Sequence, residues 1–156
     1  MIALIQRVSY AEVKVDERVT GAIGTGILAL IGVKRGDDTS SADRLLERVL
    51  SYRIFPDGAG KMNLSLLDTE GGLLLVPQFT LAADTHKGTR AGFSTAAQPD
   101  EARRLFEYLV ERARAVHAAV AIGEFGAHMS VSLTNEGPVT FWLEASSGNI
   151  DRFCAA

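Results

Sequence analysis

The chain has 156 residues, which at roughly 150 residues per domain predicts a single domain over residues 1–156. Hydrophobic residues make up 47% of the chain and charged residues 22%, a composition that is typical of a globular protein and excludes a disordered or collagen-like one. Because 16 Lys and Arg stand against 19 Asp and Glu, the net charge is −3, and a polyanionic partner has to be met by a local basic patch.

The sequence offers no pattern for a disulfide, a metal site or a membrane span. Its one cysteine, Cys154, excludes an intramolecular disulfide, and the three histidines lie far apart without metal-ligand spacing. Neither a basic segment followed by an apolar stretch at the N-terminus nor a run of about 18 apolar residues occurs. We therefore expect a cytosolic protein with no metal, no other cofactor and no membrane partner.

The first third of the chain carries strand patterns and one helix. Residues 2–8 are rich in apolar side chains, residues 11–15 alternate between apolar and charged, and residues 26–33 form a continuous apolar run typical of a buried strand. The period then changes, because apolar residues from 42 to 50 recur at helical spacing. The hydroxyl cluster at residues 39–41 is expected to cap this helix, which should end near Tyr52.

A glycine-containing turn at residues 57–61 is followed by a predicted strand that starts at residue 73 and continues to residue 81. No period holds from residue 82 to residue 98, and this loop carries His86, Lys87 and Arg90, our candidate basic patch. Pro99 opens a second helix, whose apolar stripe runs to residue 116.

Three further strands are predicted, at residues 118–122, 129–133 and 139–143. The predicted order is β-β-β-α-β-β-α-β-β-β. Because strands and helices are grouped rather than strictly alternating, we expect an α+β fold with a mostly antiparallel β-sheet or barrel and two helices packed on one side.

The usual hydrolase signatures are absent, but polar residues lie at the end of an apolar strand. In a strand, Gln78 and Thr80 point to one face and Phe79 to the other, beside the long loop, where they can form a pocket wall. The alternative is that Thr80 is a β-branched strand former and Gln78 an edge residue. These residues taken alone favour the alternative.

Gly137 and Pro138 stand between two well-patterned strands. An X-Pro bond is cis in only about 5–6% of cases in folded proteins, so these two residues taken alone favour an ordinary turn. The alternative is a rigid recognition element that exposes two backbone carbonyls, with no glycine side chain in the way.

Several segments taken together resemble the D-aminoacyl-tRNA deacylase family. They are the opening IQRVSYAEVKVD, DGAGKMNLSLLD from residue 57, PQFTLAAD from residue 77, KGTRAGF from residue 87 and GEFGAHMSVSLTNEGPVT from residue 123. The resemblance covers essentially the whole chain in order. It implies a homodimer that binds aminoacyl-tRNA and hydrolyses the ester between a D-amino acid and the terminal ribose, in chirality proofreading during translation.

The resemblance also implies roles for individual residues. The QFT motif, Gln78, Phe79 and Thr80, lines the site of the scissile ester. The residues that receive the terminal adenosine are Phe125, Gly126, Ala127 and Met129. His128 occupies a variable position there, so we expect its side chain to be exposed.

In that family the Gly-Pro peptide is cis and reaches into the pocket of the partner subunit, where it excludes L-aminoacyl groups. The matching residues are Gly137 and Pro138, with Arg7 as the arginine that braces them. The chain departs from the family pattern at Pro77, where a serine is usual, and at Glu136, where an aspartate is usual. Pro77 removes both the hydroxyl and the amide donor of that serine, whereas Glu136 keeps the charge and changes only its reach.

An aminoacyl ester is already activated, so placement and a stabilised oxyanion matter more than a strong nucleophile. The backbone amides of Phe79 and Thr80 can supply the oxyanion site. No adjacent histidine or lysine activates the Thr80 hydroxyl, which makes covalent catalysis the weaker mechanism. The resemblance implies attack by water, assisted by the 2′-hydroxyl of the ribose. The alternatives are a tRNA-binding module without deacylase activity, with Pro77 as the lesion, and a hydrolase of other D-aminoacyl or peptidyl esters.

Overall fold

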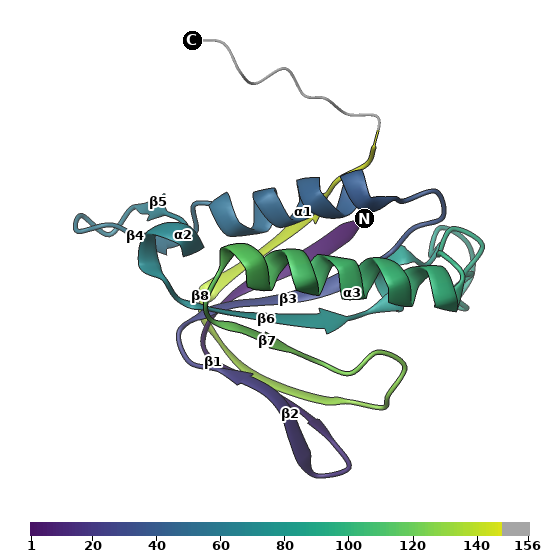
Figure 1. The fold of residues 1–156 in the computed structure, drawn as a ribbon, viewed down its shortest axis with the longest axis horizontal. Coiled ribbons are helices and arrows are strands. Elements are labelled where there is room, and N and C mark those ends of the chain that lie inside the picture. The colour runs from purple at the N-terminus through teal and green to yellow at the C-terminus, as the bar shows by residue number, and fades with distance from the viewer. Residues whose placement is uncertain (148–156) are drawn as a thin grey trace.

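The computed structural model describes residues 1–147, so Cys154 lies outside the described residues. Its main sheet has the strand order β2-β1-β3-β6-β7, with β8 on the other edge of β1 (Figure 1). The strands are β1 (Ile2–Val15), β2 (Arg18–Ile23), β3 (Gly26–Gly32), β6 (Gly72–Pro77), β7 (Val120–Ile122) and β8 (Ser130–Glu144). β1 runs antiparallel to β2, β3 and β8, whereas the β3–β6 and β6–β7 pairs are parallel. The expected α+β class is confirmed.

Two long helices, α1 (Thr39–Ser51) and α3 (Pro99–Val116), lie side by side on one face of this sheet, as expected (Figure 1). The cap of α1 differs in part from the prediction, because the N-cap is Asp38, whereas only Ser41 of the hydroxyl cluster takes part, accepting from the Asp38 amide in a capping box. The Asp38 carboxylate accepts from the amide of Ser41 at 2.9 Å, and this hydrogen bond holds the pKa of Asp38 below its usual value.

In two places, successive segments that were predicted as separate strands form one long strand. Residues 2–8 and 11–15 both belong to β1, and the predicted strands at 129–133 and 139–143 both fall, apart from Met129, in β8. The prediction of a turn at Gly137 is therefore wrong, because the chain continues along β1 on both sides of it. The predicted strand also stops at Pro77, and Phe79–Ala82 form a 3₁₀ helix, η1. Pro77 still pairs with Ile31 of β3, and the amide of Gln78 donates the last hydrogen bond of this ladder to the carbonyl of Ile31 before the chain turns into η1.

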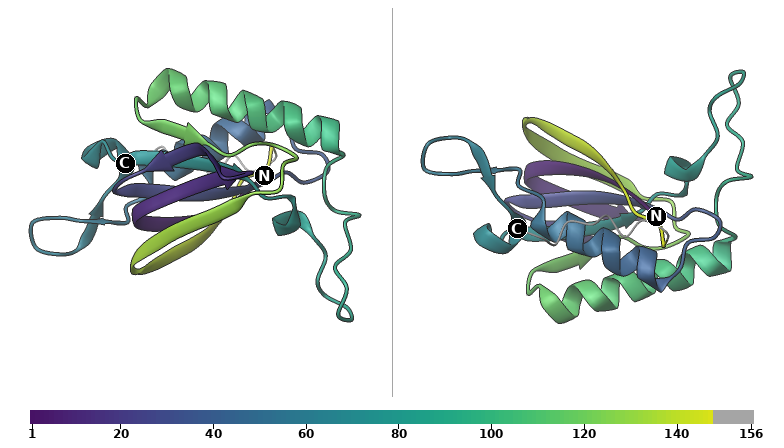
Figure 2. Two further views of the ribbon diagram at one scale, coloured as in Figure 1. Left: turned by 90° about the horizontal axis from the view of Figure 1, so that it is seen from below. Right: turned by 90° about the horizontal axis from the view of Figure 1, so that it is seen from above.

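Several short elements escaped the sequence patterns. β2 was missed, as were β4 (Phe55–Pro56), β5 (Met62–Leu64) and the one-turn helix α2 (Leu66–Thr69). The β4–β5 hairpin projects from one end of the molecule, and the segment between η1 and α3 projects from the other (Figure 2). The predicted turn at residues 57–61 closes this hairpin, where the Asp57 carboxylate accepts from the amides of Ala59 and Lys61.

The sheet curls until its outer strands approach each other. A Cβ at Gly21 of β2 would lie 2.5 Å from the carbonyl oxygen of Ile122 in β7, so only glycine allows this approach. The curl encloses a small apolar cluster formed by Val8, Ala11, Val13, Ile23, Leu28, Leu74 and Val76. The larger core lies between the sheet and the two helices and includes Ile5, Ile27, Leu45 and Leu109.

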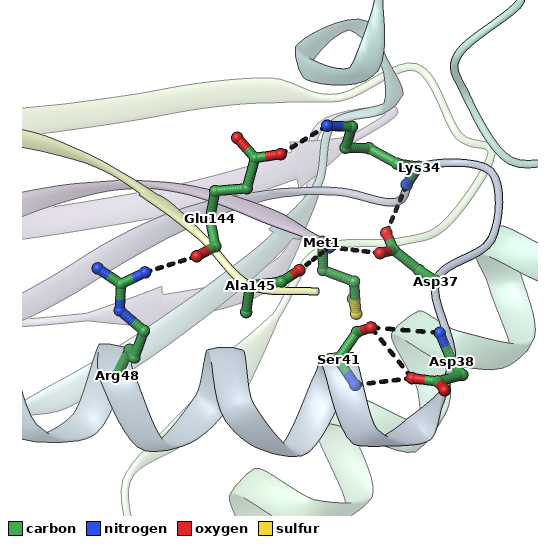
Figure 3. A network of polar contacts seen from close by, with 8 residues as sticks. All are labelled: Met1, Lys34, Asp37, Asp38, Ser41, Arg48, Glu144 and Ala145. Atoms are coloured by element: carbon green, nitrogen blue, oxygen red, sulfur yellow. Dashed lines mark hydrogen bonds and ion pairs between the residues drawn. The ribbon is translucent and has the colours of Figure 1, made fainter. Parts of the chain in front are cut away.

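A polar network joins the first residue to the end of β8 (Figure 3). The Met1 ammonium group is fully buried and donates to the Asp37 carboxylate at 2.6 Å and to the carbonyl of Ala145. The other carboxylate oxygen of Asp37 accepts from the amide of Lys34 at 2.7 Å. The Lys34 ammonium pairs with Glu144 and lowers the pKa of that carboxyl. This network fixes the ends of β1 and β8 beside the start of α1.

None of the helices in residues 1–147 combines the length and apolar character needed to cross a membrane.

We expect Asp37→Ala to lower the free energy of unfolding by about 3–5 kcal/mol, because it leaves the buried Met1 ammonium without its counter-charge. Denaturant titration followed by circular dichroism measures the change. Glu111→Ala, at an exposed position of α3, is the control and should stay within about 0.5 kcal/mol of the parent. Equal stability of the two variants would show that the ion pair contributes nothing.

Candidate active site

A cavity of about 440 Å³ opens where the end of β6, the first turn of α3 and the segment after β7 meet. Its walls include Val76, Pro77, Gln78, Phe79, Pro99, Ala102, Phe125, Gly126, Ala127, His128, Met129 and Val131. The fold therefore brings Gln78 and Phe79 of the QFT motif together with residues 125–129, the FGA-x-M stretch, which lies more than forty residues away in the sequence. Thr80 is exposed and does not line this cavity. Cavities of this size are typical of small-ligand sites.

The QFT motif follows the last strand residue, Pro77. The amide of Gln78 donates to the carbonyl of Ile31 at 2.7 Å and thereby takes the ladder position after Pro77. In η1, Leu81 is the first residue whose amide donates to a helical acceptor, the carbonyl of Gln78. The amides of Phe79 and Thr80 precede it and have no helical acceptor.

Gln78 and Thr80 lie beside each other, although not by strand alternation as predicted. The side-chain amide of Gln78 donates to the Thr80 hydroxyl oxygen at 2.5 Å. An amide nitrogen cannot take up the hydroxyl proton, so this contact orients Thr80 without activating it. Phe79 is exposed and packs against Phe93, with ring centroids 5.2 Å apart.

The FGA-x-M stretch forms the opposite wall. Gly126 adopts a positive φ of 81°, a conformation that favours glycine. A Cβ at Gly123 would lie 2.9 Å from the Met129 sulfur, so the segment is closely packed where it leaves β7. His128 is exposed, as expected, and contributes to the rim of the cavity.

The sequence analysis missed Arg103, which supports this wall from α3. Its guanidinium carbon lies 4.8 Å from the centroid of the Phe125 ring, and its Nη2 donates to the carbonyl of Phe125 at 3.4 Å. Arg103 looks like an ordinary solvent-facing helix residue in the sequence. Only the packing of α3 against the 123–126 segment shows its position.

Gly137 and Pro138 are exposed and joined by a cis peptide bond, as the family resemblance implied. Arg7 holds the segment from the side, with Nε donating to the carbonyl of Glu136 at 2.9 Å and Nη1 donating to the carbonyl of Ile54 at 2.6 Å. The structure thus brings Arg7 next to the Gly-Pro pair. None of these three residues lines the cavity of the same chain.

The segment with the candidate basic patch projects beside η1 (Figure 2). Its base is closed by two backbone hydrogen bonds between Asp84 and Gly92, at 2.8 and 2.9 Å. His86, Lys87 and Arg90 are all exposed. Residues 1–147 contain no group of three or more histidine, cysteine or acidic side chains that are placed to hold a metal ion.

Comparison with known proteins gives consistent matches. The sequence family described as D-Tyr-tRNA(Tyr) deacylase matches residues 4–144. The D-aminoacyl-tRNA deacylase of Thioalkalivibrio sulfidiphilus (strain HL-EbGR7) is 68% identical over 144 residues, covering 92% of this chain and 97% of the relative.

Two solved structures share the fold. One, described as c-Myc DNA Unwinding Element Binding Protein, has a TM-score of 0.90 at 33% identity and covers 94% of this chain and 100% of its own. The other, described as a probable eukaryotic D-amino acid tRNA deacylase, has a TM-score of 0.73 at 18% identity and covers 92% of this chain and 98% of its own. Because the family match spans nearly the whole described structure, the chain belongs to the D-Tyr-tRNA(Tyr) deacylase family.

Proposed function

We propose that this protein is a hydrolase that cleaves the ester bond of D-aminoacyl-tRNA and releases the free D-amino acid and tRNA. The observation that carries the proposal is family membership over residues 4–144, at 68% identity to a relative named D-aminoacyl-tRNA deacylase. The cavity supports it, because it joins the two motifs that the family resemblance assigns to the ester and to the adenosine.

In this proposal the terminal adenosine enters the cavity along Phe125, Gly126, Ala127 and Met129, and the ester carbonyl lies beside η1. The amides of Phe79 and Thr80 precede the first helical hydrogen bond, so they are available to a developing oxyanion. The Thr80 hydroxyl accepts from Gln78 and meets no base, which favours water as the nucleophile over Thr80. The 2′-hydroxyl of the ribose assists that water.

We further propose that the carbonyls of Gly137 and Pro138 hold the substrate ammonium group and exclude L-aminoacyl groups. A rigid block at the position of an L side chain discriminates by shape, whereas fit to one methylene supplies only about 1–3 kcal/mol. Discrimination by 10⁴ requires about 5.4 kcal/mol. Such a filter does not read the D side chain, and it does not exclude glycine.

The proposed filter needs a second copy of the chain. Gly137 and Pro138 are exposed and do not line the cavity of their own chain, so we propose a homodimer in which each copy completes the site of the other. Trp142 supports this arrangement. It is 51% exposed, and it lies on the sheet face away from the helices because its neighbour Leu143 is buried on the helix side.

The projecting segment with Lys87 and Arg90 is proposed to contact the phosphates of the tRNA body, with an affinity that falls as salt rises. The proposed setting is chirality proofreading of aminoacyl-tRNA in the cytosol.

A tRNA carrying a 2′-deoxy terminal adenosine should be bound but hydrolysed at least about 100-fold more slowly, because the proposed assisting hydroxyl is gone. Thr80→Ala should cost no more than about tenfold in kcat, the value of one orienting hydrogen bond. Single-turnover rates and filter binding separate the chemical step from binding. Unchanged turnover of the deoxy substrate, or complete loss in Thr80→Ala, would assign the reaction to Thr80 instead.

D-tyrosyl-tRNA, D-alanyl-tRNA and glycyl-tRNA should be hydrolysed, and L-alanyl-tRNA should be spared. Gly137→Ala should lower kcat/KM for the D substrates by about 100-fold, because its Cβ would lie 2.5 Å from Val139 Cγ2 and displace the segment. Gly58→Ala is the matched control, since a Cβ there meets nothing within 4 Å. The release of labelled amino acid measures all of these reactions.

The same measurements separate the proposal from its alternatives. Binding of D-tyrosyl-tRNA without release would indicate a tRNA-binding module. Equal turnover of free D-amino acid esters would indicate a general esterase. Glycyl-tRNA left intact while D-alanyl-tRNA is cleaved would contradict the filter.

The protein should sediment at twice its 16.7 kDa mass, and Trp142→Lys should shift it towards the monomer with a parallel loss of activity. Leu67→Lys is the control, because Leu67 in α2 has the same 51% exposure but lies outside the proposed interface. Sedimentation velocity and activity are measured over one concentration series. A fully active monomer at nanomolar concentration would exclude the completed-site arrangement.

A further inference from the structure

A second cavity, of about 540 Å³, lies next to the first along α3. Its lining includes Arg18, Arg103, Phe106, Glu107, Glu124 and Phe125. Phe125 lines both cavities and separates them. Ala102 lines the first cavity and Phe106 the second, and these two residues lie about 6 Å apart along the axis of α3. This separation is comparable to one nucleotide step in an extended strand.

The charges of this second cavity are mixed. Arg18 of β2 pairs with Glu124 at 3.0 Å, and Arg103 approaches Glu107 at 4.0 Å on α3. Two carboxylates beside two guanidinium groups do not suit a phosphate. They do suit a neutral group that carries hydrogen-bond donors and acceptors side by side.

Cytosine is such a group. Its N4 amino group donates and suits a carboxylate, and its ring nitrogen and carbonyl oxygen accept and suit a guanidinium group. The four charged side chains are exposed ion pairs, which are weak and open at little cost to admit a ligand. The partly buried ring of Phe125, backed by the buried ring of Phe106, adds apolar surface for a base.

We propose that this second cavity binds the cytidylate that precedes the terminal adenosine of the tRNA 3′ end. The inference rests on the proposed function, which puts the adenosine in the first cavity. The next nucleotide then passes Phe125 and lies between Arg18 and Glu124 on one side and α3 on the other. The chain thereby reads the penultimate base as well as the terminal one.

The test compares 3′-O-D-alanyl-adenosine with the same ester of the dinucleotides cytidylyl-adenosine and uridylyl-adenosine. The cytidylyl ester should have a kcat/KM about tenfold above the nucleoside ester, and the uridylyl ester should lose most of this gain, because uracil presents a carbonyl to the carboxylates. Arg18→Ala should abolish the gain and leave hydrolysis of the nucleoside ester unchanged. Arg18→Lys should restore part of it.

Arg44→Ala is the matched control, because Arg44 is also paired with a glutamate but lies on α1, outside both cavities. Calorimetry with uncharged cytidylyl-adenosine and adenosine gives a readout that does not depend on deacylation. If the dinucleotide binds more tightly than adenosine and Arg18→Ala removes this difference, the subsite is supported, even where no ester is hydrolysed. A failure to hydrolyse any ester would overturn only the proposed function. Equal affinity for both probes, or equal losses on both esters in Arg18→Ala, would overturn the subsite.

Discussion

The pairing of β1 with β8 is the constraint on which the rest of the site depends. One edge of β1 pairs with β8 along most of its length, and the other edge pairs first with β3 and then with β2. Gln6 pairs with Thr140 and Val8 with Asn135, so a single residue of β1, Arg7, faces the whole segment 136–139 of β8. The extra residues of β8 have no ladder partners in β1, so they leave the ladder as a largely exposed segment. Arg7 lies directly opposite and fixes it through backbone carbonyls.

Close backbone contacts determine where the cavities form. A Cβ at Gly26 would lie 1.9 Å from the carbonyl oxygen of Gly72, so β3 and β6 approach closely where their parallel pairing begins. Gly21 permits a similar approach of β2 to β7. Because β6 and β7 run parallel, their carboxyl ends lie at the same edge of the sheet, and the segments that follow them meet there. The start of α3 covers that junction, which gives one cavity on each side of Phe125.

The two faces of the sheet are used differently. One face is covered by α1 and α3 and carries the main core, which leaves it little freedom to change. The other face leaves Trp142 exposed, and the Gly-Pro segment also lies in the open. One chain therefore presents a cavity and, apart from it, a braced pair of backbone carbonyls. In the proposed homodimer, a second copy brings such parts together without any change in the fold of either chain.

The sequence by itself determined the α+β class, both long helices and the family, because hydrophobic period is a local signal and the QFT and FGA-x-M motifs are contiguous. It did not determine that residues 130–143 belong to one strand, since the ladder partner in β1 lies more than a hundred residues away. It misplaced Phe79–Ala82, where local β-propensity predicted a strand but the chain turns into a 3₁₀ helix directly after the last hydrogen bond to β3, which Gln78 donates. Only the tertiary structure decided the position of Arg103 beside Phe125 and the presence of the second cavity, because both depend on the packing of α3 against the segment after β7. Local patterns follow from local sterics and hydrophobicity, whereas contacts between distant segments are fixed only when the whole core packs.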